Sequence, residues 1–269
     1  MYNTTHEQRF DNDAPAAPEQ LSLLSEILNR ETFSILGTEV AVGHGWRCWD
    51  VGTGDGSVAR WLAARVGTNG HVVASDLKPQ HVPTHPRIEA ISHDLTSDPW
   101  PEPGFDLIHA RLLLMHLADR DAIAAKLAEH LRPGGALVLT DWFCGCATES
   151  LIKSPVDEYR ARIFQEFHDG VHKLGAETGM DFDWGARTAD VLRAAGHQDV
   201  TVRDYQAPGR GGEPTALLAQ LHSGMLEPFL LSQTSLTAAD LAVIRETLID
   251  PEFEMLTNHT YTTIVRAPK

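Results

Sequence analysis

The chain has 269 residues, of which 42% are hydrophobic and 22% charged, and its formal net charge is −15 at pH 7. This length predicts one large α/β domain that needs no disulfide or metal to bury a core. The negative charge argues against DNA or RNA as a partner, because nucleic-acid-binding surfaces carry clustered Lys and Arg that neutralise phosphates.

The cysteines indicate a reducing compartment. There are three, Cys48, Cys144 and Cys146, and Cys48 falls in a predicted buried strand. No signal peptide or long apolar span is visible, so we expect a cytoplasmic protein that does not enter a membrane. For Cys144 and Cys146 a metal site or a strained disulfide is the minor alternative, and two ordinary loop residues are the favoured interpretation.

The first predicted elements are helices. Residues 1–17 are polar and look loosely ordered. Leu21, Leu24, Ile27 and Leu28 recur at helical spacing. A second short helix is expected over Glu31–Val40.

A glycine-rich loop follows the first predicted strand. Residues 49–57 place Gly52, Gly54 and Gly56 at alternate positions, directly before a helical pattern. Glycine accepts backbone angles that other residues cannot adopt and leaves the main chain accessible to a ligand. The N–H groups that open the next helix favour an anionic partner, so the pattern indicates a nucleotide-binding turn.

Two residues around this loop argue against a nicotinamide cofactor. Asp50 stands where a dinucleotide-binding strand is normally apolar. Ser57 stands where the nicotinamide fingerprint needs its last glycine. A nicotinamide-dependent oxidoreductase therefore stays open only as an alternative.

Further strands and helices alternate downstream. This order is typical of right-handed βαβ units that build a parallel sheet. Ile123, Leu127 and Leu131 line one face of the helix before the fifth strand. The predicted strands are His71–Ser75 ending at Asp76, Arg87–Ile91 running into Asp94, Phe105–Ala110, and Ala136–Thr140 after the loop Arg132–Gly135.

Together these features resemble the class I S-adenosylmethionine-dependent methyltransferases, with five ordered matches across residues 48–142. The stretches Gly-Trp-Arg-Cys, Gly-Ser-Val-Ala-Arg-Trp-Leu and His-Ala-Arg-Leu-Leu-Leu are similar to small-molecule, natural-product methyltransferases of actinobacteria. The resemblance implies a Rossmann-like, seven-stranded mixed sheet between helices, with the last strand antiparallel between the fifth and sixth. It also implies a single domain 1–269, made of an N-terminal helical cover (1–40), a cofactor-binding core (45–145) and helical caps (150–180 and 212–250).

The resemblance assigns roles to individual residues. Asp50 would hold the cationic amino-acid end of the cofactor, directly or through water, above the glycines. Asp76, beside Leu77, would accept both ribose hydroxyls, although by sequence alone it would also suit NAD. Asp94 would bind the adenine amino group and Leu95 would flank the ring. The end of the fourth strand, Ala110 and Arg111, would border the cofactor.

The second half of the chain predicts mostly helices. Ser154 and Pro155 suit a helix start, with Ser as the N-cap. This helix continues through Leu174. The other predicted elements are helices Asp183–Ala195, Thr215–Leu231 and Thr237–Leu248, and strands Val200–Tyr205 and Thr260–Val265.

His168 and His172 are the candidate catalytic residues. They lie one helical turn apart beside apolar residues, so they share one helix face and could supply a general base. The alternatives are solvated imidazoles on a helix rim or a two-histidine metal site. Gly170 weakens the helix and no third ligand is evident, so we expect no metal.

The resemblance therefore implies methyl transfer from S-adenosylmethionine, leaving S-adenosylhomocysteine, to an O, N or C atom of a small aromatic or heterocyclic metabolite of secondary metabolism. Trp142 and Trp184 are among the aromatic residues that could line the binding site of the acceptor or belong to the core. We expect a monomer or homodimer with a small-molecule substrate. A further alternative is a protein that binds the cofactor but catalyses a rearrangement without methyl transfer.

Overall fold

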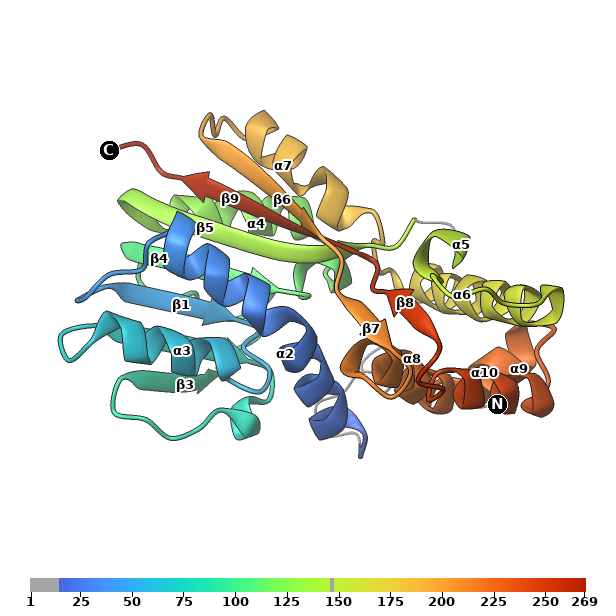
Figure 1. Cartoon of the computed structure of the whole chain (residues 1–269). Coiled ribbons are helices and arrows are strands. Elements are labelled where there is room, and N and C mark those ends of the chain that lie inside the picture. Colours follow the sequence, from blue (N-terminus) through green and yellow to red (C-terminus); the bar gives the residue numbers. More distant parts are fainter. Residues whose placement is uncertain (1–14, 146–147) are drawn as a thin grey trace. The chain divides into compact units, whose positions relative to one another are not determined.

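A computed structural model describes residues 15–145 and 148–269 (Figure 1). The described residues form two compact units. The sheet unit contains residues 29–143, 183–205 and 260–269, and the helical unit contains residues 15–28, 144–145, 148–182 and 206–259. The expectation of a single domain stays a prediction, and its N-terminal cover lies partly outside the described residues.

The sheet unit is built on a seven-stranded sheet of order β3-β2-β1-β4-β5-β9-β6. Strands β1 to β5 pair in parallel, whereas β9 lies between β5 and β6 and runs antiparallel to β6. This confirms the predicted mixed Rossmann-like sheet. The strands are β1 (Arg47–Val51), β2 (His71–Asp76), β3 (Ile88–Ser92), β4 (Phe105–Arg111), β5 (Leu131–Phe143), β6 (Val200–Tyr205) and β9 (His259–Arg266).

Helices cover both faces of this sheet. Helix α3 (Ser57–Val66) packs on β1 and β2, and α4 (Arg120–Glu129) and α7 (Trp184–Ala194) pack on β5 (Figure 1). Alternate residues of each strand point to opposite faces. Leu62 and Val66 of α3 therefore meet one apolar set from the strands, which includes Cys48, Val72, Leu107 and Val138.

The fifth strand begins earlier than predicted. Leu131 pairs with Phe105 and so belongs to β5, not to the face of the preceding helix, which ends at Glu129. The register then shifts, and Leu107 pairs with Ala136. The predicted loop Arg132–Gly135 is thus an irregular part of the strand.

The N-terminal helices also differ from the prediction. One continuous helix, α2 (Ala17–Ser34), replaces the expected pair, and a π-helical turn, η1 (Ile35–Glu39), follows it directly. No proline or glycine interrupts residues 19–34, so nothing in this stretch ends the helix.

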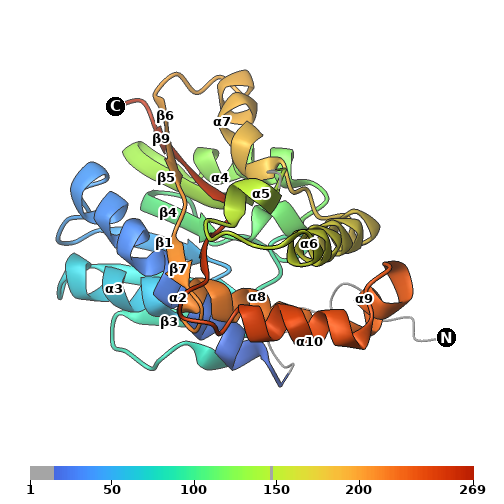
Figure 2. The same ribbon diagram turned by 45° about the vertical axis from the view of Figure 1, so that its right-hand side comes forward.

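The helical unit contains a cluster of helices and a two-stranded sheet. Its helices are α5 (Thr148–Leu151), α6 (Glu158–Thr178), α8 (Pro214–Met225), α9 (Glu227–Gln233) and α10 (Ala238–Thr247) (Figure 2). Phe164 of α6, Leu230 of α9 and Leu241 of α10 belong to one apolar core. The antiparallel strands β7 (Pro208–Arg210) and β8 (Glu254–Leu256) were not predicted.

Two predicted helix boundaries in this unit were wrong. Asp157, not Ser154, caps α6 and accepts a hydrogen bond from the Arg160 N–H. Ser154 Oγ instead donates to the Glu252 carbonyl and accepts from the Glu254 N–H. The predicted helix Thr215–Leu231 divides into α8 and α9, because Pro228 favours the first turn of a new helix.

Candidate cofactor site

The glycine loop leaves β1 at the carboxyl edge of the sheet. The loop has positive φ angles at its three glycines, 65° at Gly52, 56° at Gly54 and 71° at Gly56. Residues with a side chain rarely adopt such angles. A Cβ on Gly52 would lie 2.9 Å from Leu113 Cδ2, and one on Gly56 would lie 2.8 Å from Pro83 Cδ. Both the conformation and the packing of the loop therefore require glycine.

Asp76 ends the neighbouring strand and faces this loop. Its Oδ2 accepts from the Gly54 N–H at 3.0 Å, and its Oδ1 accepts from the Lys78 N–H at 3.1 Å. A carboxylate oxygen can accept more than one hydrogen bond, and Asp76 lies at the carboxyl edge of the sheet. Leu77 follows with 61% of its surface exposed, the largest fraction among the exposed large apolar side chains of the described residues.

Asp94 and Leu95 follow the next strand, β3. The Thr96 N–H and Oγ1–H donate to Asp94 Oδ1 at 2.8 and 2.6 Å, and they hold the pKa of Asp94 below its usual value. Asp94 is therefore an anion at neutral pH. Leu95 is buried, and its carbonyl accepts a hydrogen bond from Trp100 Nε1. Its contact with the adenine ring of the cofactor stays a prediction.

Asp50 is buried beneath the loop. Its Oδ1 lies 2.7 Å from His109 Nδ1, and its Oδ2 accepts from Thr53 Oγ1 at 2.6 Å. Asp50 and His109 are register neighbours on β1 and β4, which explains their contact. In this conformation both carboxylate oxygens of Asp50 contact protein groups. Asp50 therefore stabilises the glycine loop through its hydrogen bond with Thr53.

Arg111 is the charged residue at the end of β4, after the buried Ala110. Its guanidinium donates to Asn29 Oδ1 and Thr32 Oγ1, both at 3.0 Å. Desolvation lowers the pKa of Arg111, and the charges of Asp50 and Asp55 oppose this effect. A desolvated cation that donates to neutral oxygens is suited to an anionic ligand group.

Asn29, Thr53 and His109 escaped sequence-based prediction. Asn29 Oδ1 accepts from Ser57 Oγ as well as from Arg111, so it joins the first turn of α3 to the end of β4. Arg111 lies 82 positions further along the chain than Asn29. No local pattern marks contacts between residues so far apart. The order of the strands could have indicated only His109, as a neighbour of Asp50.

Asp141 is a further carboxyl near the end of β5. It follows Thr140 on β5, is buried, and accepts from Trp184 Nε1 at 3.1 Å. Burial raises the pKa of Asp141 to about 8, although this hydrogen bond and the backbone N–H groups of residues 113–115 lower it. Trp184 is fully buried within the sheet unit, in agreement with the core alternative.

His168 and His172 lie on α6 in the helical unit, half-buried, with ring centroids 4.3 Å apart. The ring of Phe182 stacks on His172 at 4.9 Å. Burial, and then the charge of His172, lower the pKa of His168 to about 4. His168 is therefore neutral at pH 7 and able to accept a proton, but it is a weak base.

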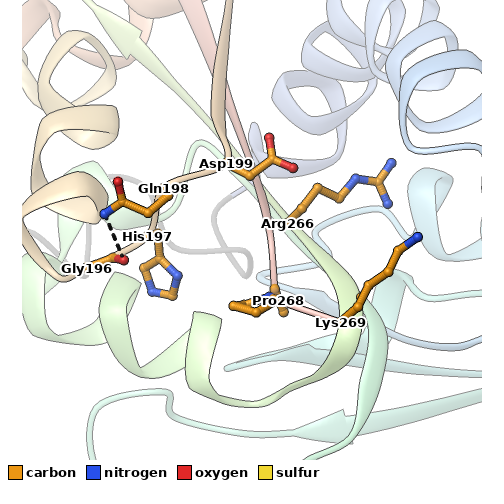
Figure 3. Close-up of a pocket in the computed structure, with 9 residues that line it drawn as sticks. Gly196, His197, Gln198, Asp199, Arg266, Pro268 and Lys269 are labelled. Atoms are coloured by element: carbon orange, nitrogen blue, oxygen red, sulfur yellow. Dashed lines mark hydrogen bonds between the residues drawn. The ribbon is translucent and has the colours of Figure 1, made fainter.

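A pocket of about 640 Å³ lies elsewhere in the sheet unit (Figure 3). It is lined by the segment before β6, by the end of β9 and by Gly134. Gln198 Nε2 donates to the Gly196 carbonyl at its rim, and Arg266 donates to the Glu39 and Val40 carbonyls. These segments lie at the amino edge of the parallel strands, opposite Asp76, so this pocket is not the predicted cofactor site.

Cys48 and Cys144 are buried, and burial raises the pKa of the Cys48 thiol. Cys146 lies outside the described residues. Within residues 15–145 and 148–269, no three His, Cys, Asp or Glu side chains are grouped so that they could hold a metal. In the same part of the chain no helix has the length and apolar character needed to cross a membrane.

Comparisons with known proteins point in one direction. A family model described as a methyltransferase domain matches residues 49–135. The chain is 30% identical over 214 residues to the methyltransferase GfsG of Streptomyces halstedii, and the match covers 75% of each chain. It is 31% identical over 175 residues to the methyltransferase str2 of Strobilurus tenacellus, covering 64% of this chain and 60% of str2.

A solved structure shares the fold. Phosphoethanolamine N-methyltransferase 2 of Haemonchus contortus, in complex with S-adenosyl-L-methionine, matches with a TM-score of 0.59 at 13% identity. The match covers 99% of this chain but 61% of the Haemonchus chain. At this identity the likeness concerns the fold alone.

Proposed function

The chain belongs to the class I S-adenosylmethionine-dependent methyltransferases, and we propose that it methylates an O, N or C atom of a small aromatic or heterocyclic metabolite of secondary metabolism. The observation that carries the cofactor assignment is the pairing of the Gly52–Gly56 loop with the Asp76 carboxylate at 3.0 Å. This arrangement is expected where a carboxylate binds the hydroxyls of a ribose at the carboxyl edge of a parallel sheet.

The residues of this edge fit S-adenosylmethionine part by part. Asp76 would accept the ribose hydroxyls, and the exposed Leu77 would contact the adenine. Asp94, an anion that follows the next strand, would accept from the adenine amino group. When bound, the cofactor supplies an electrophilic methyl group on a sulfonium.

Arg111 would bind the carboxylate of the methionine part. Its guanidinium donates to Asn29 on α2, and Asn29 also accepts from Ser57 Oγ, directly after the glycine loop. A charge-assisted hydrogen bond would give the desolvated cation the anionic partner that Asn29 and Thr32 do not provide. Asp50 would act indirectly, by fixing Thr53 in the loop.

His168 and His172 would act on the acceptor. Positioning of the acceptor is the main catalytic requirement of methyl transfer and is worth about 7–11 kcal/mol. A general base adds about 10²–10⁴-fold where the accepting atom carries a proton. The neutral His168 would take up that proton, and its contact with His172 would orient it.

The small-molecule acceptor is supported by the net charge of −15, which opposes binding to a nucleic acid. The likeness to GfsG of a Streptomyces supports an actinobacterial type of methyltransferase. We place the protein in the cytoplasm, as a monomer or homodimer. Family membership disfavours the nicotinamide-dependent alternative.

Incubation with methyl-labelled S-adenosylmethionine tests the proposal. Phenols, amines and indoles are the predicted acceptors, and phosphoethanolamine is included because related proteins carry its name. A labelled phenol, amine or indole supports the proposal. Labelled phosphoethanolamine alone contradicts the acceptor class, and cofactor binding without any labelled product favours the rearrangement alternative.

A further inference from the structure

A buried polar pair interrupts the apolar core of the sheet unit near the end of β4. His109 and Asp50 are each 1% exposed, and His109 Nδ1 lies 2.7 Å from Asp50 Oδ1. Leu107 lies on the same face two positions before His109, and Val138 is the register neighbour of His109 on β5. Both belong to the apolar core that packs on α3. Apolar side chains would avoid the desolvation of such a pair, so packing alone does not explain why it stands here.

The surroundings of the pair indicate which nitrogen of His109 carries the proton. Asp50 Oδ2 accepts from the Thr53 hydroxyl at 2.6 Å, and an anionic carboxylate only accepts hydrogen bonds, so His109 Nδ1–H is the donor to Oδ1. His109 Nε2 is buried and has no hydrogen-bond partner among the described residues. An N–H at this atom would be a buried donor without an acceptor, so the geometry favours the neutral Nδ1–H tautomer.

Thr53 connects this pair to the glycine loop. It is 7% exposed, and its hydroxyl is the group of the loop that donates to Asp50. Its N–H donates to the Ser75 carbonyl at 3.0 Å, and its carbonyl accepts from the Gly56 N–H at 3.0 Å. The hydroxyl, the N–H and the carbonyl of Thr53 are therefore all engaged. A change in the position of the Asp50 carboxylate reaches the loop through the Thr53 hydroxyl.

We propose that His109 is a positioning residue for cofactor binding: its Nδ1–H keeps the Asp50 carboxylate anionic and directed at Thr53. The proposal rests on the proposed function, in which the glycine loop binds S-adenosylmethionine. Two effects follow from this hydrogen bond. The loop is held in one conformation, and a negative charge stays beneath it, where it attracts the sulfonium and ammonium groups of the cofactor.

Substitutions of His109 separate the hydrogen bond from the packing of the side chain. Leucine is apolar and donates nothing, so it leaves Asp50 with one partner in an apolar core. Asparagine carries an N–H donor near the position of Nδ1 and can keep the bond to Asp50 Oδ1. Asparagine is also smaller than histidine and packs less well. Rescue by asparagine therefore distinguishes the positioning of Asp50 from a role in packing.

The test compares His109→Leu, His109→Asn and Thr188→Val by calorimetric titration with S-adenosylmethionine at pH 7, alongside thermal unfolding. Thr188→Val is the matched control, because it removes a buried hydrogen bond within α7, from Thr188 Oγ1 to the Trp184 carbonyl at 2.7 Å. We expect His109→Leu to raise the dissociation constant about tenfold or more, while His109→Asn and Thr188→Val stay within about threefold.

A double variant tests the connection through Thr53. Thr53→Val should raise the dissociation constant about fivefold, and adding it to His109→Leu should weaken binding by no more than about a further twofold, because both act through Asp50. Three results would overturn the proposal: unchanged affinity in His109→Leu, equal weakening by His109→Asn, and effects that multiply in the double variant. If His109→Leu does not fold, unchanged affinity in Thr53→Val counts against the proposal.

Nitrogen NMR of the His109 ring separates this proposal from the proposed function. If the unmodified protein binds neither S-adenosylmethionine nor S-adenosylhomocysteine, the proposed function fails. The spectrum without ligand should still show the Nδ1–H tautomer of His109, with this proton protected from exchange with water. The absence of the signal in His109→Asn assigns it. A ring without a proton on Nδ1 would show that His109 does not donate to Asp50.

Discussion

Aspartates follow or end several strands of the sheet, and their surroundings give them different properties. Asp76 accepts two backbone N–H groups and stays accessible, whereas Asp50 is buried and engaged by His109 and Thr53. Asp94 has a lowered pKa and Asp141 a raised one. Hydrogen-bond donors favour the anion and desolvation disfavours it, so residue type alone does not fix the role of a carboxylate.

Asp76→Ala should weaken cofactor binding. The variant loses an acceptor for the ribose hydroxyls, and hydrogen bonds to a charged group contribute about 1.5–3 kcal/mol each. We expect the dissociation constant of S-adenosylmethionine in calorimetry to rise at least about tenfold. Asp190→Ala, an exposed carboxylate on α7, is the control, and equal affinities of the two variants would refute the assignment of Asp76.

Asp141 should make stability depend on pH. Burial raises its pKa from 3.8 to about 8 in the folded protein. Between these values the unfolded chain releases the proton that the folded protein keeps, so the free energy of unfolding falls as pH rises. The loss from this group is on the order of 1 kcal/mol per pH unit, and it ends above pH 8.

Urea unfolding at pH 5 and pH 7 measures this effect. Asp141→Asn lacks the titrating group, so its stability should fall less between the two pH values than that of the unmodified protein. Identical pH dependence in both proteins would show that the pKa of Asp141 is not raised.

His168→Gln should lower kcat and leave cofactor affinity unchanged. A general base contributes about 10²–10⁴-fold, so we expect a loss of about 10²-fold with a proton-bearing acceptor. His172→Gln, the neighbour on the same helix face, should have a smaller effect because it acts through His168. Equal activity of His168→Gln and the unmodified protein would exclude His168 as the base.

At the scale of elements, helix ends were harder to predict than helices. Ser154 and Asp157 are both good N-caps, but Ser154 is bound to residues 252 and 254, close to β8, a contact that the sequence does not reveal. Thr237 was correctly placed at the start of α10. There its side chain and that of Asp240 form a reciprocal capping box.

Thr237→Ala should lower the free energy of unfolding by about 1 kcal/mol, because the N–H of Asp240 loses its side-chain acceptor. Ser235→Ala, two residues earlier and outside the capping box, should change it by less than about 0.5 kcal/mol. Chemical denaturation measures both values. Equal losses would mean that the capping box does not stabilise α10.

At the scale of the whole molecule, the parallel sheet was predictable, because strands, helices and glycine turns alternate regularly from Arg47 to Thr140, whereas the place of the last strand was implied only by the family resemblance. The positions of Asp76 and Asp94 at strand ends were predictable for the same reason, since Asp76 ends β2 and Asp94 follows β3. The contacts of Arg111 with Asn29 and of Asp141 with Trp184 were not, since they join distant segments through side-chain packing. Such packing also determines which acceptor molecule the protein binds. The sequence therefore predicts only the chemical class of the acceptor.

A crystal structure of the protein with S-adenosylhomocysteine tests the central claim most directly. The account predicts the ribose hydroxyls on Asp76, the adenine against Leu77 and the carboxylate on Arg111. A nucleoside bound at another edge of the sheet, or bound at this edge without contact to Asp76, would contradict it.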